Sequence, residues 1–249
     1  MSAPELVQAT VAVHDLEDAG IRERLGLVPG FSDPELAAWA ITNEVFTLGD
    51  TYLEVVAPSG PGSRLHRFLE DGAGGYLVAL RVPDSAALAG RCAAMGVRIV
   101  HRQDLAGAAI LQLHPGDLGV LVEADEMPPG RAWHYDTWDT PGRSPGARAG
   151  DLVAVDVAVA DPAGTAATWS RLFGLPVEES AVDGDPEGGA ARGRAVRAGR
   201  GLIRFVPAST TGGGRGLVAL DLRAPEAGVI ETAGLTIRLF PHEVIGGTA

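Results

Sequence analysis

The feature of this sequence that most constrains its fold is an alternating apolar segment that occurs four times. The four copies are 6-LVQATVAVHDL-16, 76-YLVALRVPDS-85, 152-LVAVDVAVADP-162 and 216-GLVALDLRAPE-226. Apolar side chains that recur with period two predict a β-strand in each copy. A segment that recurs at similar intervals is typical of a fold built from repeated structural units.

Each of the first three copies leads into a stretch that favours a helix. The stretches 15-DLEDAGIRERLGL-27, 84-DSAALAGRCAAMGV-97 and 161-DPAGTAATWSRLFGL-175 begin with an aspartate that can cap a helix and contain a glycine that can end it. Further strands are predicted at residues 44–48, 51–57, 109–114, 119–124, 194–199 and 202–208. The repeated unit is therefore β-α-β-β-β. The fourth unit is truncated, because only about two helical turns fit between Ala224 and the strand 234-GLTIRLFP-241.

These units predict an α+β protein with two domains of two units each. Residues 1–126 are predicted to form the first domain and residues 151–249 a degenerate second domain. The segment 127-MPPGRAWHYDTWDTPGRSPGARAG-150 is rich in Pro, Gly and Arg, which predicts a linker. Its aromatic residues Trp133, Tyr135 and Trp138 are expected to pack against one of the domains, because a free linker seldom carries such side chains.

Charge and composition exclude several classes of function. The formal net charge is -12 and the basic residues are scattered, so the chain is not expected to bind nucleic acid. The sequence contains no lysine, which excludes lysine Schiff-base chemistry and a Walker-type phosphate loop. Cys92 is the single cysteine, so no intramolecular disulfide can form. There is no apolar run of membrane-spanning length and no signal-peptide pattern at the N-terminus, so we predict a cytoplasmic protein with no membrane partner.

Four stretches of the N-terminal half are similar to a known superfamily: 49-GDTYLEVVAPSGPGS-63, 65-LHRFLEDGAGG-75, 77-LVALRVPD-84 and 112-QLHPGDLGVLVE-123. They resemble the vicinal oxygen chelate superfamily, which includes glyoxalase I, methylmalonyl-CoA epimerase, bleomycin-resistance proteins and extradiol dioxygenases. Residues 5–125 are most similar to the epimerases, whereas residues 151–241 match only as a degenerate repeat. The resemblance implies two glyoxalase-like domains, each with its strands curled into a cup-shaped mixed sheet.

Members of this superfamily hold a divalent metal with one residue from the first and last strands of both units. By resemblance, these positions are Gln8, Glu54, Leu77 and Glu123. Leu77 stands where the family has a histidine. The resemblance therefore implies a metal site of Gln8, Glu54 and Glu123 for Mg²⁺, Mn²⁺, Co²⁺, Ni²⁺ or Zn²⁺. It also implies that Glu123 or Glu54 is the catalytic carboxylate that moves a proton.

Strand alternation predicts which side chains share a face with these residues. The expected sets are Leu6, Gln8, Thr10 and Ala12; Tyr52, Glu54 and Val56; Leu77, Ala79 and Arg81; and Leu121 with Glu123. We therefore expect a ligand pocket lined by Thr10, Tyr52, Leu77, Arg81 and Leu121, with Tyr76 on the opposite face. In an alternative without a metal, the long side chain of Arg81 reaches back and pairs with Glu54 or Glu123.

Two functions remain open at this point. The first is a metal-assisted lyase or isomerase, in which an enediolate is stabilised while a carboxylate moves a proton. The alternative is a metal-free small-molecule-binding protein of the bleomycin-resistance type, without catalytic activity. The partner is a small molecule in both cases, and a homodimer is a further prediction because sheet edges in this fold commonly pair. The sequence offers no His-His-Glu set of the kind that extradiol dioxygenases use.

In the second domain, the corresponding positions are Ala154, Ile203 and Leu217, none of which can bind a metal. Asp156 and Asp221 are expected on the equivalent inner faces. They are predicted to be solvated or paired with arginine, or else to line a second pocket.

The histidines offer few candidates for the missing metal ligand. His66, predicted near the rim of the cup, is the best of them. His114 is expected to have a structural role in closing a hairpin. His134 lies in the linker, where the sequence assigns it no role.

Overall fold

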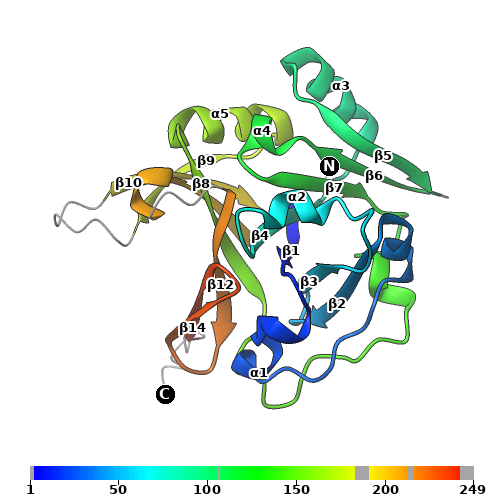
Figure 1. The fold of residues 1–249 in the computed structure, drawn as a ribbon. Helices are drawn as coiled ribbons and strands as arrows, with labels where there is room; N and C mark the ends of the chain where they lie inside the picture. Colours follow the sequence, from blue (N-terminus) through cyan, green and yellow to red (C-terminus); the bar gives the residue numbers. More distant parts are fainter. Residues whose placement is uncertain (1–2, 106, 183–190, 212–215, 242–249) are drawn as a thin grey trace, which may run out of the picture.

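The computed structural model of the protein describes residues 3–105, 107–182, 191–211 and 216–241, and its fold is shown in Figure 1. The strands of the N-terminal half are β1 (Glu5–Ala12), β2 (Ile41–Thr47), β3 (Tyr52–Pro58), β4 (Gly74–Arg81), β5 (Ile99–Leu105), β6 (Ala108–Leu113) and β7 (Leu121–Glu126). Those of the C-terminal half are β8 (Leu152–Val159), β9 (Val177–Val182), β10 (Ala191–Ala198), β11 (Gly201–Pro207), β12 (Gly216–Ala224), β13 (Gly228–Thr232) and β14 (Leu235–Pro241). All of them belong to one curved, mixed sheet, so the predicted α+β class is confirmed.

The α-helices are α1 (Ile21–Leu25), α2 (Leu65–Leu69), α3 (Ser85–Met95), α4 (Pro115–Leu118) and α5 (Pro162–Phe173). The short 3-10 helices are η1 (Glu17–Ala19), η2 (Pro34–Trp39), η3 (His134–Thr137) and η4 (Ala208–Thr211). As predicted, Asp84 and Asp161 cap α3 and α5, where their carboxylates accept the backbone N–H groups of Ala87 and Gly164 at 2.7 and 3.0 Å.

Two of the predicted helical regions differ from the expectation. The first is broken into η1 and α1, because Gly20 between them has a φ of +58° and a left-handed backbone cannot continue a helix. In the fourth unit β13 follows β12 after a short turn, so the space predicted for two helical turns contains a strand that pairs with β14.

The strand pairing shows the internal repeat. In the N-terminal half, β1 runs parallel to β3, β4 runs parallel to β7, and β1 and β4 pair antiparallel. In the C-terminal half, β8 with β11, β12 with β14, and β8 with β12 repeat this pattern. The first and last strands of every unit therefore lie at the centre of their half, and residues on these strands can meet.

Within the described part of the sheet, one bridge between β4 and β12 joins the two halves, with Gly75 opposite Leu217. A Cβ atom on Gly75 would overlap the backbone carbonyl oxygen and the side chain of Leu217. Glycine is therefore the residue that allows the two strands to approach each other here.

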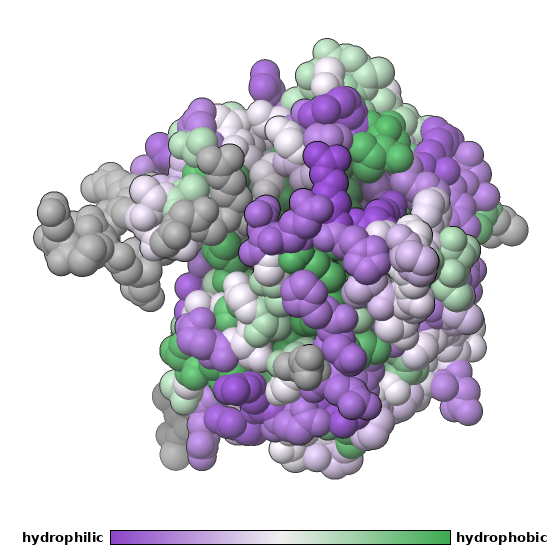
Figure 2. Space-filling model, viewed as in Figure 1, coloured by the Kyte–Doolittle hydropathy of each residue, from purple (hydrophilic) through white to green (hydrophobic). Residues whose placement is uncertain are grey.

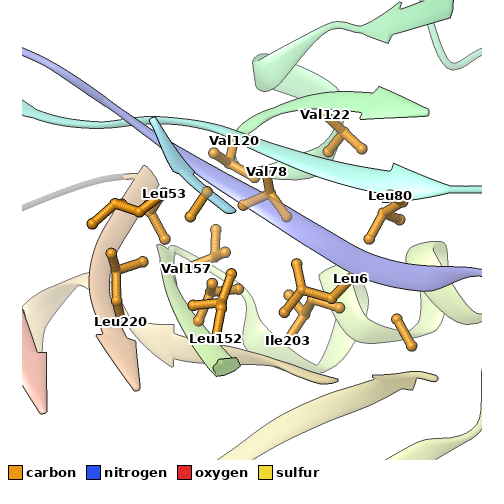
Figure 3. Packing of buried hydrophobic residues seen from close by; sticks show 14 of the residues in the cluster. Leu6, Leu53, Val78, Leu80, Val120, Val122, Leu152, Val157, Ile203 and Leu220 are labelled. Atoms are coloured by element: carbon orange, nitrogen blue, oxygen red, sulfur yellow. The ribbon is translucent and has the colours of Figure 1, made fainter. Parts of the chain in front are cut away.

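The main hydrophobic core lies between the strands of the two halves. Figure 3 shows side chains of the N-terminal strands, such as Leu6 and Val78, opposite Leu152, Ile203 and Leu220 of the C-terminal strands. Because this core contains residues of both halves, the predicted division into domains at residues 126 and 151 stays a prediction. Side chains alternate along each strand, so the opposite faces of both halves point away from the shared core.

The face shown in Figure 2 is mainly hydrophilic, with hydrophobic residues in separate patches rather than one continuous area. No helix in the described part of the chain is long and apolar enough to span a membrane.

Candidate functional site

The four positions that the resemblance assigned to a metal site line one cavity of about 80 Å³ in the N-terminal half. These positions are Gln8 on β1, Glu54 on β3, Leu77 on β4 and Glu123 on β7. We call this cavity the inner pocket. Its other lining residues are Thr10, Asp33, Leu36, Ile41, Val56, Arg64, Tyr76, Gln112 and Tyr135.

Glu54 lies at the centre of a hydrogen-bond network on the floor of the inner pocket. Its Oε1 accepts from the Asn43 amide at 2.7 Å, and its Oε2 accepts from the Gln8 amide and the Thr10 hydroxyl, each at 2.9 Å. The side chain is buried, and this burial raises the pKa of Glu54 to about 7. Hydrogen bonds from these donors favour the charged form and would lower the pKa. Because the pKa is raised, the cost of removing the carboxylate from water must be larger than their effect.

Glu123 presents a second carboxyl group to the same cavity. In the described structure its side chain has one hydrogen bond, from the Gln112 amide to Oε2 at 2.7 Å. Burial and the nearby carboxylate of Asp125 raise the pKa of Glu123 to about 7 as well. The charge of Glu123 also makes a smaller contribution to the raised pKa of Glu54.

A larger cavity of about 290 Å³ adjoins the inner pocket, and we call it the outer pocket. The two cavities share Asp33, Leu36, Arg64, Gln112, Glu123 and Tyr135. Trp39, His101, Arg131, His134 and Trp138 are among the other residues of the outer pocket. A ligand that entered through the outer pocket would therefore reach Glu123 before Glu54.

The segment after β7 closes one side of the cup, and its aromatic residues pack against the N-terminal half, as the prediction that they pack against one domain required. In Figure 1 this segment runs outside β2 and β3 before the chain enters β8. Trp133 and Tyr135 are buried with the cup residues of β1, β2, β4 and β7, and the Trp133 indole N–H donates to Gln8 Oε1 at 3.4 Å. The Tyr135 ring contacts Phe31 and Tyr52 edge-on, with ring centroids 5.0 and 5.1 Å apart.

This segment also supplies a histidine whose role the sequence did not reveal. His134 Nε2 lies 2.8 Å from the Oδ2 of Asp125, a residue with no exposed surface. Burial raises the pKa of Asp125 well above its usual value and lowers the pKa of His134. Asp125 follows Glu123 by two residues, so strand alternation could have identified it as a cup residue. The position of His134 depends on the path of the linker, which has no comparable periodicity.

Some of the predicted pocket residues line the inner pocket, and others lie elsewhere in the structure. Thr10 and Leu77 line the inner pocket, whereas Tyr52 and Leu121 pack against the linker aromatic residues without lining either the inner or the outer pocket. Arg81 was expected to line the pocket or pair with Glu54 or Glu123, but it pairs with Glu5 and donates to the Ala132 carbonyl at 3.0 Å. The predicted ligand-lining role of Arg81 is therefore wrong for this cavity.

Two strand irregularities explain the errors in the predicted faces. A register shift between Leu6 and Gln8 turns Leu6 into the shared core and leaves Val7 on the cup side. A second shift, beside Tyr76, brings that residue into the inner pocket instead of the opposite face. Strict alternation cannot predict such shifts.

The two histidine predictions have different outcomes. His66 is exposed, bonds through Nε2 to the Gly60 carbonyl at 3.0 Å, and lines neither pocket, so it does not replace the missing ligand. His114 accepts the Gly116 N–H at 2.9 Å and caps α4 in the connection between β6 and β7, which agrees with its expected structural role.

The donor set of the inner pocket does not fit a divalent metal. Leu77 contributes no donor atom, and both oxygens of Glu54 already accept hydrogen bonds. The Gln8 amide directs its N–H, not its oxygen, towards Glu54. No group of three or more His, Cys, Asp or Glu residues in the described part of the chain is arranged to hold a metal ion.

The cup of the C-terminal half is filled by four charged residues, which we call the charge ring. Asp156 and Asp221 each accept hydrogen bonds from both Arg204 and Arg238, at distances of 2.5 to 2.6 Å. The prediction that these aspartates pair with arginine is confirmed. Asp156 lies opposite Arg204 in the sheet, so Arg204 occupies the place equivalent to Glu54; Ile203, which we expected there, is in the shared core.

No protein-family model matches the chain, and no curated protein matches it. Solved structures do match. A hypothetical protein from Staphylococcus aureus has a TM-score of 0.67 at 10% identity, over 96% of this chain and 100% of that one. A mutant of 4-hydroxymandelate synthase from Streptomyces coelicolor has a TM-score of 0.67 at 19% identity, over 91% of this chain and 72% of that one.

A methylmalonyl-CoA epimerase from Mycobacterium tuberculosis matches the chain at 26% identity, with a TM-score of 0.43, over 50% of this chain and 89% of that one. The two matches over nearly the whole chain show that both halves share their fold with known proteins. The predicted glyoxalase-like fold is confirmed.

Proposed function

We propose that the N-terminal cup binds a small organic molecule and moves a proton to or from one of its carbon atoms, as a lyase or isomerase. One observation carries this proposal: Glu54 and Glu123 face one cavity from different strands, and each has a pKa raised to about 7. A general acid or base works best when its pKa is close to the working pH. Because both pKa values are about 7, the state with one protonated and one ionised carboxyl is well populated near neutrality.

The hydrogen bonds suggest a role for each carboxyl group. Glu123 is the proposed base, because it adjoins the outer pocket and is held only by Gln112 among the described residues. It would remove a proton from a carbon next to a carbonyl group. Glu54 is the proposed acid: its Oε1 accepts a single hydrogen bond, from Asn43, so this oxygen can carry the proton that is donated to the developing oxyanion.

The proposed reaction does not require a metal. A neutral carboxylic acid in a buried site can stabilise an enolate oxygen by donating a hydrogen bond. The donor set described above supports this form of the reaction over the metal-assisted one, because Leu77 is apolar and both oxygens of Glu54 already accept a hydrogen bond.

The proposal can be tested by exchange of carbon-bound hydrogen with solvent deuterium. Small ketones, 2-oxo acids, hydroxy acids and acyl thioesters would be incubated with EDTA-treated protein in D₂O and followed by NMR. Glu123→Gln and Glu54→Gln are each expected to slow exchange by about 100-fold or more. Glu70→Gln is a matched control, because Glu70 is exposed and outside both pockets.

Three results would contradict the proposal. Exchange that appears only after addition of Mn²⁺, Co²⁺ or Ni²⁺ would restore the metal-assisted reaction. Exchange that persists in both glutamine variants would remove the assigned roles. Ligand binding without exchange in any compound would support the alternative, a binding protein without catalytic activity, which the aromatic side chains of Trp133, Tyr135 and Trp138 beside the cup also favour. The cytoplasmic location and the homodimer stay predictions.

A further inference from the structure

Two arginines of the outer pocket form no ion pair or hydrogen bond with a carboxylate in the described part of the chain. Arg64 lies over the Trp39 ring, with its guanidinium carbon 4.7 Å from the ring centroid. Arg131 donates through Nη2 to the backbone carbonyls of Trp133 and His134, at 3.4 and 2.7 Å. Neither forms an ion pair with any described residue, although the chain carries a formal net charge of -12. Both side chains line the same cavity.

Arg131 also has an unsatisfied donor. Its Nε is buried and has no hydrogen-bond partner in the described structure. A buried N–H group without an acceptor is unfavourable, and more so when the group is charged. An acceptor on a bound molecule would remove this cost.

Gln112 supplies an unsatisfied acceptor at the place where the two pockets meet. Only 7% of this residue is exposed, and it lines both cavities. Its amide N–H donates to Glu123, which leaves its Oε1 buried with no partner in the described part of the chain. This oxygen requires a donor, such as a hydroxyl group.

We propose that the outer pocket binds the carboxylate of a hydroxycarboxylic acid through Arg64 and Arg131, while Gln112 Oε1 accepts its hydroxyl. This inference rests on the proposed function and names its substrate class. A carboxylate matches the donor geometry of a guanidinium better than any neutral group. Three acidic residues also line the outer pocket. Asp33 accepts the Glu35 N–H at 2.9 Å, Glu35 is exposed, and Glu123 is the proposed base.

In this arrangement each polar group of the acid meets a group of opposite kind. Arg64 and Arg131 hold the carboxylate in the outer pocket, and Gln112 holds the hydroxyl where the two pockets meet. The carbon atoms between and beyond them then lie next to Glu123, the proposed base. The arginines act in binding and orientation, and Glu123 with Glu54 in proton transfer, so the two roles can be separated by experiment.

The test uses three probes of equal chain length: 2-hydroxyhexanoate, hexanoate and 1,2-hexanediol. Binding is measured by isothermal titration and by the rise in Tm with probe concentration. We expect 2-hydroxyhexanoate to bind more tightly than hexanoate, and the neutral diol to bind at least tenfold more weakly than the hydroxy acid, a difference of 1.4 kcal/mol. Arg64→Gln and Arg131→Gln are each expected to weaken binding of the hydroxy acid by about tenfold.

Arg67→Gln is the matched control, since Arg67 is exposed on α2, close in sequence to Arg64, and lines neither pocket. Arg131→Gln also removes contacts to the linker backbone, so Arg64→Gln decides the result if the Arg131 variant unfolds.

Equal binding of the diol and the acid, or equal weakening in Arg67→Gln, would overturn the proposal. Equal affinity for hexanoate and 2-hydroxyhexanoate would overturn the role of Gln112, and binding of inorganic phosphate in place of either acid would overturn the choice of a carboxylate.

These outcomes are independent of the proton-transfer test. Arginine-dependent binding with no exchange in any compound would support the site and refute the proposed reaction. Exchange that needs Glu123 but does not depend on either arginine would support the reaction and refute the site.

Discussion

Replacement of Glu54 by glutamine is predicted to remove a specific pH dependence of stability. In the folded protein the pKa of Glu54 is about 7, whereas the ordinary value for the unfolded chain is 4.5. Between these two pH values the folded state therefore holds a proton that the unfolded state has released. The free energy of unfolding falls as the pH rises through this window, because the folded state must give up a proton that it binds more tightly.

The magnitude follows from the difference of about 2.5 pKa units, which corresponds to about 3 kcal/mol. At pH 5 the wild-type Glu54 and the glutamine are both uncharged in the folded state. At pH 8 only the wild type carries a buried negative charge. Part of this difference lies below pH 5, so we expect the stability of Glu54→Gln relative to wild type to rise by about 2.5 kcal/mol between pH 5 and pH 8.

The assay is urea unfolding at pH 5, 6, 7 and 8, followed by the fluorescence of the buried Trp133 and Trp169. The comparison between variant and wild type cancels the contributions of His134 and Asp125, whose pKa values also differ between the folded and unfolded states. Glu70→Gln is the control for the replacement of an exposed glutamate outside both pockets. A constant difference between Glu54→Gln and wild type, or a wild type that gains relative stability as the pH rises, would refute the reasoning.

Three further substitutions test other parts of the structure by urea or thermal unfolding. Arg238→Gln, in the charge ring, is expected to lower the free energy of unfolding by about 3–5 kcal/mol because it leaves a buried carboxylate short of a partner; a loss below about 1 kcal/mol would contradict this. His134→Ala should cost about 1–3 kcal/mol by leaving Asp125 buried without its hydrogen bond, and unchanged stability would show that this pair is unimportant. Gly75→Ala should cost about 1–3 kcal/mol and speed amide exchange in β4 and β12, because the new Cβ overlaps Leu217; unaltered exchange would show that the bridge can adjust.

The strands that the sequence predicts well are those buried on at least one face. β1, β4, β8 and β12 each pack apolar residues into the shared core, so burial imposes a readable alternation. β5 is an edge strand whose residues are mostly exposed, so its sequence has no apolar alternation and the strand was not predicted. β9 and β13 were not predicted either. The break at Gly20 could not be predicted from helix-favouring residues alone.

The candidate site was predictable to the extent that a resemblance supplies equivalent positions. Gln8, Glu54 and Glu123 line one cavity, as the resemblance implied, but what they bind there is still a proposal. The resemblance could not place His134, because its position depends on how the linker packs. It also put Ile203 in place of Arg204, an error of one residue that moves a side chain to the other face of a strand.

The path of the segment after β7 sets a practical limit on how this protein can be divided. A fragment cut at residue 126 would end before Arg131 and His134, and would uncover the cup residues that Trp133 and Tyr135 shield. The C-terminal half would in turn lose the apolar surface against which it packs. We therefore expect truncation at the apparent boundary to give an aggregation-prone piece, because it exposes apolar surface of both halves.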